Sequence, residues 1–145
     1  MSKIINYSIL RDYNSIDNLL SENDFRILLL EDKENSGHWT CIMKLPEGIC
    51  YFNSYGEQYD KDLSIIPRMI RKILGEERPE LGRLLGGQPC NWNKFKFQDD
   101  KSENCGRFVM WIIYKCIYND FGFDEALDLL KSKGPDYDRY VEVFT

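Results

Sequence analysis

The clearest structural pattern in the chain is the stretch HWTCIMKLPEGICYFNSYG at residues 38–56. Residues that favour β-strands are frequent in 38–45 and 49–56, and the proline, glutamate and glycine at 46–48 between them have the chemistry of a turn. This pattern predicts a β-hairpin. Because the two ends of a hairpin meet, it would bring His38 and Asn53 side by side.

The segments outward from this hairpin predict further strands and helices. RILLLED at 26–32 has the apolar run of a buried strand, and SIDNLLSEN at 15–23 predicts a short helix capped by Ser15. The apolar spacing within 63–74 predicts an amphipathic helix. NWNKFKFQ at 91–98 alternates in the manner of a half-buried strand.

The last part of the chain is predicted to be helical. The apolar run that follows Cys105 predicts a helix to about Asn119, and FDEALDLLKS at 123–132 predicts another. Strands grouped before terminal helices predict an α+β protein, with a small mixed central sheet flanked by helices and Cys105 at the N-terminus of a buried helix. A length of 145 residues suits one domain, residues 1–145.

Composition and charge exclude several classes of function. The formal net charge of −5 gives no general electrostatic reason to bind nucleic acid or an anionic membrane. The basic residues gathered at 67–85 are explained as well by a solvated helix face. No segment has the ~18 consecutive apolar residues of a membrane span, and the N-terminus lacks a signal peptide's features, so we expect a soluble, unexported protein.

The cysteine and histidine counts argue against disulfides and metals. The five cysteines are odd in number and none forms a CxxC pair, so neither a disulfide framework nor a zinc knuckle is predicted. With one histidine in the chain, a Cys/His metal site is not expected. We therefore expect neither a metal nor a cofactor.

One cysteine has the sequence context of a reactive thiol. In SENCGRF at 102–108, Cys105 stands where a helix begins, and unpaired N–H groups there favour a thiolate. Taken alone, Cys105 is equally readable as a small buried hydrophobic residue.

A thiol protease also needs a base, a residue that orients the base, and donors for the oxyanion. His38 is the one histidine available as the base, and the hairpin would place Asn53 beside it, although NSYG is also good turn sequence. Gln98 lies seven positions before Cys105, a separation that suits an amide donor acting with the backbone N–H of Cys105.

The order GHW, FNSYG, then glutamine followed by NCGRF resembles the adenovirus maturation protease and its relatives, the ubiquitin-like-protein-specific proteases. The resemblance covers about residues 26–118 and is specific, because papain-like enzymes place the cysteine before the histidine. It implies that Cys105 is the nucleophile, His38 its base, Asn53 the orienting residue and Gln98 the oxyanion donor. Gly37, Trp39 and Asn104 would bind substrate, with core packing an open alternative for Trp39.

Two features depart from the family pattern. Most relatives carry Asp or Glu where this chain has Asn53, and a neutral amide can orient an imidazole without stabilising its charge. The chain is also compact and acidic, which argues against the DNA and peptide activation of the adenoviral enzyme. Cys90 lies roughly where that enzyme links its activating peptide, and a buried thiol is the alternative that we favour there.

The sequence thus predicts a cysteine endopeptidase that cleaves after glycine in capsid or core precursors during virion maturation. The resemblance implies a large DNA virus, a virophage or a polinton-type source, with the protein acting in the virion and the infected cell. The sequence does not identify the oligomeric state, and we expect a monomer. Its expected partners are protein substrates, with no membrane and no nucleic acid. A deconjugase of ubiquitin-like modifiers and an inactive interaction module on the same fold are the alternatives.

Overall fold

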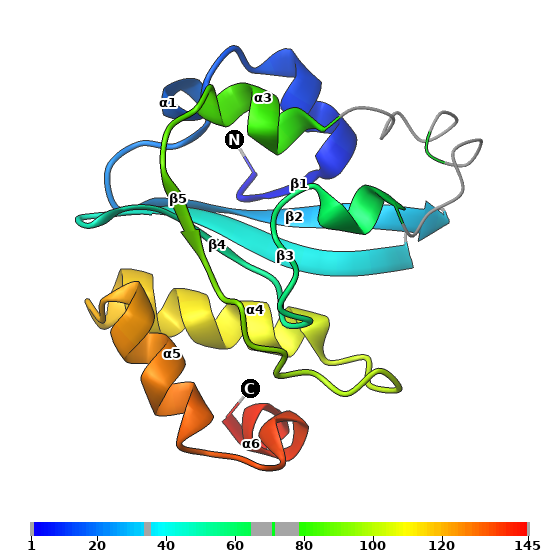
Figure 1. Cartoon of the computed structure of the whole chain (residues 1–145), viewed down its shortest axis with the longest axis vertical. Coiled ribbons are helices and arrows are strands. Elements are labelled where there is room, and N and C mark those ends of the chain that lie inside the picture. Colours follow the sequence, from blue (N-terminus) through cyan, green and yellow to red (C-terminus); the bar gives the residue numbers. More distant parts are fainter. Residues whose placement is uncertain (1, 34–35, 65–70, 72–78, 145) are drawn as a thin grey trace.

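The computed structural model describes residues 2–33, 36–64, 71 and 79–144 of the chain. Its centre is a five-stranded mixed sheet with the strand order β1-β2-β3-β4-β5 (Figure 1). The outer pairs, β1 with β2 and β4 with β5, are parallel, and the two inner pairs are antiparallel. The strands are β1 (Ile4–Asn6), β2 (Asp24–Lys33), β3 (Ser36–Leu45), β4 (Gly48–Phe52) and β5 (Cys90–Trp92).

The predicted hairpin is confirmed as β3 and β4, with a tighter turn than expected. Leu45 pairs with Gly48, so Pro46 and Glu47 alone form the turn, and Cys41 pairs with Phe52 at the other end. The second strand ends at Phe52 rather than continuing to residue 56. Its end is set by Asn53, whose carbonyl accepts the Gly56 N–H at 2.8 Å and closes a turn.

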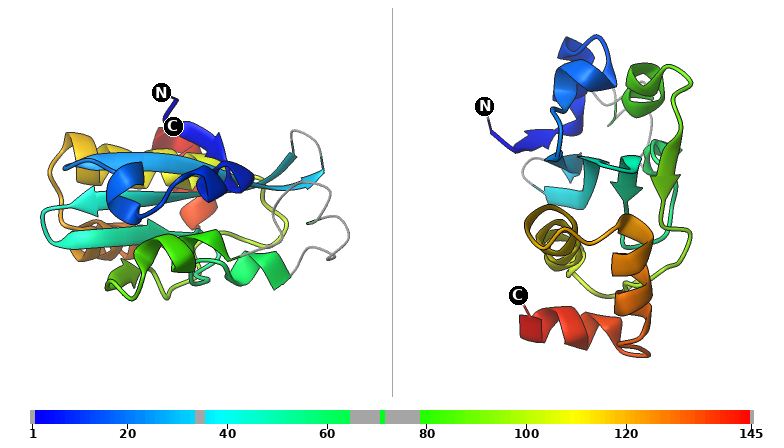
Figure 2. Two further views of the ribbon diagram at one scale, coloured as in Figure 1. Left: turned by 90° about the horizontal axis from the view of Figure 1, so that it is seen from above. Right: turned by 90° about the vertical axis from the view of Figure 1, so that its left-hand side faces the viewer.

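Helices cover both faces of the sheet (Figures 1 and 2). One face carries the 3₁₀ helix η1 (Tyr7–Asp12), α1 (Ile16–Leu19) and α3 (Glu80–Leu85), with a second 3₁₀ helix, η2, at Lys61–Ser64. The opposite face carries α4 (Cys105–Ile113), α5 (Phe123–Lys131) and α6 (Tyr137–Phe144). A π-helical segment, η3 (Tyr114–Tyr118), extends α4. The coarse α+β class, a mixed sheet flanked by helices, is confirmed.

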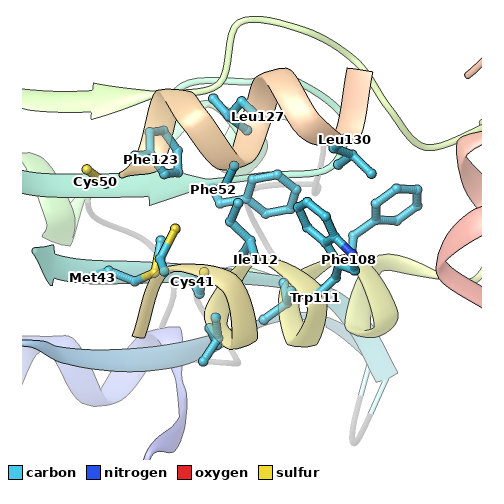
Figure 3. Packing of buried hydrophobic residues seen from close by; sticks show 14 of the residues in the cluster. Cys41, Met43, Cys50, Phe52, Phe108, Trp111, Ile112, Phe123, Leu127 and Leu130 are labelled. Atoms are coloured by element: carbon cyan, nitrogen blue, oxygen red, sulfur yellow. The ribbon is translucent and has the colours of Figure 1, made fainter. Parts of the chain in front are cut away.

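The two hydrophobic layers follow from the alternation of side chains along the hairpin. Cys41 and Met43 belong to the core cluster beneath α4 and α5, whereas Ile42 between them belongs to the cluster on the other face. In Figure 3, Phe52, Phe108 and other buried side chains from β4, α4 and α5 meet in the first cluster. Each fully buried side chain of this size contributes about 1.5–3 kcal/mol, so this layer fixes α4 against the sheet.

Helix α4 begins at Cys105, the residue predicted from the sequence. Its apolar run extends to Tyr118 through the π-helical segment, close to the predicted end at Asn119. The short helix after Ser15 is also confirmed, because the Ser15 hydroxyl accepts the Asn18 N–H and caps α1.

The prediction of a strand over residues 91–98 is wrong beyond Trp92. Strand β5 ends there, and the Asn93 side chain bonds to the backbone of Asn53 in place of a strand partner. The amphipathic helix predicted within 63–74 lies mostly outside the described residues. The elements that the sequence did not reveal are β1, η1, α3 and α6.

Candidate active site

The thiol of Cys105 lies at the start of α4, buried to 8% exposure, where the helix meets the beginning of β3. Burial raises the pKa of the Cys105 thiol, but a hydrogen bond with the His38 side chain opposes this effect. Hydrogen bonds from the backbone N–H groups of Trp39 and Gly106, together with the charge of His38, lower it further. The resulting pKa lies below the ordinary value of a cysteine, which favours the thiolate.

His38 makes its second contact with Asn53, as the hairpin predicts. The distance between His38 Nε2 and Asn53 Oδ1 is 2.8 Å. The same Oδ1 accepts the backbone N–H of Tyr55 at 2.9 Å, which identifies this atom as the amide oxygen. Nε2 must therefore donate its hydrogen to Asn53, which leaves Nδ1 of the ring for the thiol of Cys105.

An aromatic ring covers one face of the imidazole. The ring of Tyr55 is stacked on His38 with centroids 4.8 Å apart and an interplanar angle of 29°. Such a ring stabilises the charged form of the imidazole through its π-electrons.

The backbone N–H and carbonyl of Asn53 are both held by one side chain. The Asn93 side chain accepts the Asn53 N–H at 3.0 Å and donates to the Asn53 carbonyl at 2.6 Å, so one amide mimics a paired strand. Asn53 is fully buried and Asn93 is 1% exposed. Asn53 is at once the turn residue and the partner of His38, so the two interpretations of NSYG are compatible.

The turn after Asn53 requires glycine at its last position. Gly56 has a φ of +76°, and a Cβ there would stand 2.9 Å from the backbone of Phe95 and Lys96. The close approach holds the segment around residues 93–98 against the end of the hairpin. The Phe97 and Gln98 N–H groups both donate to the Ser54 carbonyl, at 2.9 and 3.0 Å.

Gln98 lies between the hairpin and the loop that leads to the nucleophile. Its Oε1 accepts the Ser54 hydroxyl at 2.5 Å, and its Nε2 donates to the Ser102 carbonyl at 2.9 Å. The side chain is 2% exposed and is therefore held rigidly. These contacts give Gln98 a structural role in the loop, and its role as an oxyanion donor stays a prediction.

Trp39 lies beside the nucleophile and lines a hollow on the surface. A Cβ placed on Gly106 would lie 3.9 Å from Trp39 Cδ1, so the indole faces the first turn of α4. The hollow has a volume of about 380 Å³ and is lined by Trp39, Glu103, Gly106, Arg107 and Met110. Trp39 also packs at the edge of the core cluster, so it has both the contacts of a core residue and those of a groove wall.

The structure gives Gly37 and Asn104 roles other than the predicted contact with substrate. A Cβ on Gly37 would lie 2.1 Å from the Leu30 carbonyl oxygen, so glycine is needed there for β3 to approach β2. The side-chain amide of Asn104 donates to Asp138 and Glu142, at 3.0 and 2.9 Å. Substrate binding by these two residues stays a prediction.

The other four cysteines have the opposite electrostatic setting. Burial raises the pKa of Cys41 and Cys50, and it raises that of Cys90 and Cys116 to about 12. They are unpaired thiols, three of them buried and Cys90 half-buried. Cys105 is the one cysteine whose pKa is lowered.

Two observations on the described part of the chain concern metal ligation and membrane insertion. Within it, no cluster of three or more histidine, cysteine, aspartate or glutamate side chains has the geometry to hold a metal ion. None of the helices in these residue ranges has the length and apolar character needed to span a bilayer.

Several residues of the site were not found from the sequence. They are Ser54, Tyr55, Asn93 and Ser102, with Asp138 from α6. Asparagine is a poor strand residue, so the two asparagines around Trp92 signalled that β5 would end early. No sequence signal indicated that Asp138 would return to the loop before Cys105.

The chain is similar to a virophage protein. It is 38% identical over 114 residues to "Uncharacterized protein V9" of Sputnik virophage. The match covers 75% of this chain and 65% of V9, so the chain spans about two thirds of the length of that relative. No family model matches the chain, and no solved structure matches it. The likeness supports a viral origin and says nothing of activity.

Proposed function

We propose that this chain is a cysteine endopeptidase with Cys105 as nucleophile and His38 as general base. One observation carries the proposal: the thiol of Cys105 is hydrogen-bonded to His38 and has a lowered pKa, while Nε2 of the same histidine donates to Asn53. A nucleophile, a base and an orienting residue in that order of contact are what thiol catalysis requires.

In the acylation step, His38 holds the proton of the Cys105 thiol and the sulfur attacks the carbonyl carbon of the scissile peptide. The carbon–sulfur bond forms and negative charge moves to the carbonyl oxygen. The imidazolium then gives its proton to the leaving amine as the carbon–nitrogen bond breaks. Tyr55 stacked on the ring supports its charged form, which partly replaces the carboxylate that Asn53 lacks.

The oxyanion needs donors already in place. Cys105 is the first residue of α4, so its backbone N–H has no acceptor within the helix. Gln98 has two amide hydrogens, and Ser102 accepts from its Nε2 with the carbonyl at 2.9 Å and with the hydroxyl at 3.3 Å. We propose that the longer of these two contacts, to the Ser102 hydroxyl, is exchanged for the oxyanion when substrate binds. Water then attacks the thioester, His38 takes its proton, and the acid product leaves as the thiol is restored.

We assign the substrates as proteins cut after glycine. The indole of Trp39 faces the first turn of α4, where a side chain next to the scissile bond would collide with it. The exposed Met110 in the adjacent hollow offers an apolar surface for a residue further upstream.

The motif order supports a maturation protease of the adenoviral and ubiquitin-like-protease type, and the likeness to a virophage protein supports its viral origin. Its proposed substrates are capsid or core precursors, cut in the virion or the infected cell. A site that accepts glycine before the scissile bond serves this role and a deconjugase equally, so the substrate test includes both.

The test measures thiol reactivity and cleavage together. Iodoacetamide at pH 6 should modify Cys105 before the other four thiols, because the reactive thiolate is present only there. A fluorogenic peptide ending in Gly-Gly should be cleaved, and Cys105→Ala should cleave none. Faster turnover of a ubiquitin-like fluorogenic substrate than of the peptide would instead identify a deconjugase. Equal labelling of all five thiols with no cleavage of either substrate would leave an inactive module.

A further inference from the structure

We infer that Asp138, on the C-terminal helix α6, is a positioning residue for the oxyanion side of the active site. The inference rests on the proposed peptidase function. It concerns the loop of residues 99–104, which joins Gln98 to Cys105 and determines how these two residues stand relative to each other.

Asp138 binds this loop at three points. Its Oδ2 accepts the Asp99 N–H at 2.8 Å, next to Gln98. Its Oδ1 accepts the Ser102 hydroxyl at 2.5 Å and the Asn104 side-chain amide at 3.0 Å, next to Cys105. One carboxylate thus holds the beginning, the middle and the end of the loop.

The loop also has hydrogen bonds that do not involve Asp138. The Ser102 N–H donates to the Asp99 carbonyl, the Lys101 N–H donates to the Asp99 side chain, and the Asn104 side-chain amide donates to Glu142. Asp99, Asp100, Lys101 and Glu103 are exposed, so burial contributes little to its order. Hydrogen bonds to an ionised carboxylate are among the stronger ones in proteins. The bonds to Asp138 therefore supply the link that ties the beginning, the middle and the end of the loop to α6.

Ser102 passes the restraint on to Gln98. Its hydroxyl is oriented by Asp138, and its carbonyl accepts Gln98 Nε2 at 2.9 Å. The other end of the Gln98 amide is held by Ser54, which follows Asn53 in the chain. A continuous chain of hydrogen bonds thus runs from α6 through the loop to the end of the hairpin that carries the partner of His38.

Helix α6 is anchored without Asp138, so it can serve as a fixed support. Val141 is fully buried against the core, and Tyr140 packs edge-on against Trp111 of α4 with centroids 6.0 Å apart. Tyr137 packs edge-on against Phe97 with centroids 5.2 Å apart. Replacing Asp138 should therefore free the loop without detaching the helix.

The experiment is a double-mutant cycle between Asp138→Ala and Gln98→Ala, with peptide cleavage as the readout. Asp138→Ala should lower kcat by ~10–10²-fold, since a misplacement of about 1 Å can have this effect, while KM changes less than about twofold. In the Gln98→Ala background the same change should lower kcat less than about threefold, because the residue it positions is gone. Asp138→Asn keeps one acceptor oxygen, so its kcat should lie between those of the wild type and Asp138→Ala.

Asp128→Ala is the matched control, because it removes an exposed aspartate from α5 and leaves the loop contacts intact. Its kcat should equal that of the wild type. The pH profile of Cys105 alkylation should not change in Asp138→Ala, since His38 contacts the thiol from β3. Multiplicative effects of Asp138→Ala and Gln98→Ala, or a KM effect alone, would overturn the inference.

Amide hydrogen exchange tests the loop independently of activity. The backbone N–H of Asp99 donates to Asp138, and that of Asn104 donates to the Ser102 hydroxyl, which Asp138 orients. Asp138→Ala should accelerate exchange at these two backbone amides at least about tenfold, whereas Asp128→Ala should not. Unchanged exchange would refute the inference even in an active enzyme. If the wild type cleaves neither substrate, the proposed function fails, and a change in exchange would then show a structural role for Asp138 and no catalytic one.

Discussion

The two ends of one helical segment place a cysteine in opposite electrostatic surroundings. Cys105 begins α4 and Cys116 lies in the π-helical segment that continues it, and both are buried, at 8% and 2% exposure. Burial raises the pKa of both thiols. At Cys105 the imidazole of His38 and two backbone N–H groups reverse this effect, whereas at Cys116 burial and the charges of Glu47 and Glu125 leave the pKa at about 12.

The difference teaches that burial alone does not tell a reactive thiol from a core one. What separates them is the set of hydrogen-bond donors and charges brought in by other parts of the fold. The two residues have the same side chain and belong to one continuous helical segment. The following variants test whether this contrast has the expected consequences.

The largest effect is expected from removing one thiol or the other. Cys105→Ala should lower the kcat for a Gly-Gly peptide by on the order of 10⁴-fold or more, as the loss of a nucleophile does in other enzymes. Cys116→Ala should leave kcat within about twofold of the wild type. Progress curves of both purified variants decide the point, and more than trace turnover by Cys105→Ala would remove that residue from the mechanism.

Removing the imidazole should make Cys105 resemble Cys116. In His38→Gln the burial of the thiol remains while its main stabilising partner is lost, so its pKa should rise. Because alkylation follows the thiolate, which disappears as the pH falls below the pKa, the rate at pH 6 should drop at least roughly 30-fold. The rate profile from pH 5 to 10 measures the shift, with Cys116 as the internal reference. An unmoved profile would show that His38 does not set the pKa.

Weakening the support of His38 should have a smaller effect. Asn53→Ala removes the acceptor of Nε2 and should lower kcat about tenfold, because it loosens the ring without removing a charge. Asn53→Asp should be tolerated, since a carboxylate can accept from both His38 and the Tyr55 N–H. Steady-state kinetics of the two variants, with circular dichroism as a check on folding, make the comparison. Activity lost equally in both would point to a need for the amide itself.

Trp39, beside Cys105, should control which residue precedes the cleaved peptide bond. In the wild type, leucine in place of glycine at P1 should cost at least roughly 2 kcal/mol in kcat/KM, the usual range for overpacking a tight site. Trp39→Ala should lower that discrimination about fivefold and also weaken binding. A peptide library with P1 varied provides the measurement. Undiminished discrimination would assign Trp39 to the core alone.

The smallest effect concerns stability rather than activity. Cys116→Ala leaves a small cavity in a packed cluster and should lower the free energy of unfolding by about 1 kcal/mol. Cys105→Ala should change it less, because burial of a thiolate is itself unfavourable. Urea titrations at pH 7 compare the two. A larger loss in Cys105→Ala would mean that its thiol is chiefly a packing residue.

Local chemistry made part of the site predictable. The hairpin follows from strand residues around Pro46 and Glu47, and its pairing carries His38 and Asn53 to the same end of the hairpin. The start of α4 at Cys105 follows from polar residues before an apolar run. These features depend on neighbours a few positions apart, or on one pairing across a tight turn.

Contacts between segments far apart in the chain could not be predicted from the sequence. Helix α3 lacks a local capping side chain, and its Leu81 and Gly82 N–H groups donate to Asp60, far earlier in the chain. The asparagines around Trp92 indicate an early end of β5, but its cause, the bond from Asn93 to the Asn53 carbonyl, joins residues 40 positions apart.

The sequence by itself determined the hairpin, the helix that begins with a cysteine, and the types of side chain that thiol chemistry needs. The tertiary structure alone decided the low pKa of Cys105, the hydrogen bonds of Asn93 to Asn53, and the support of the loop of residues 99–104 by Asp138. The physical reason is that strand period, turn residues and helix caps act over a few neighbouring positions. By contrast, a pKa and the order of a polar loop depend on donors and charges that only the complete fold brings together.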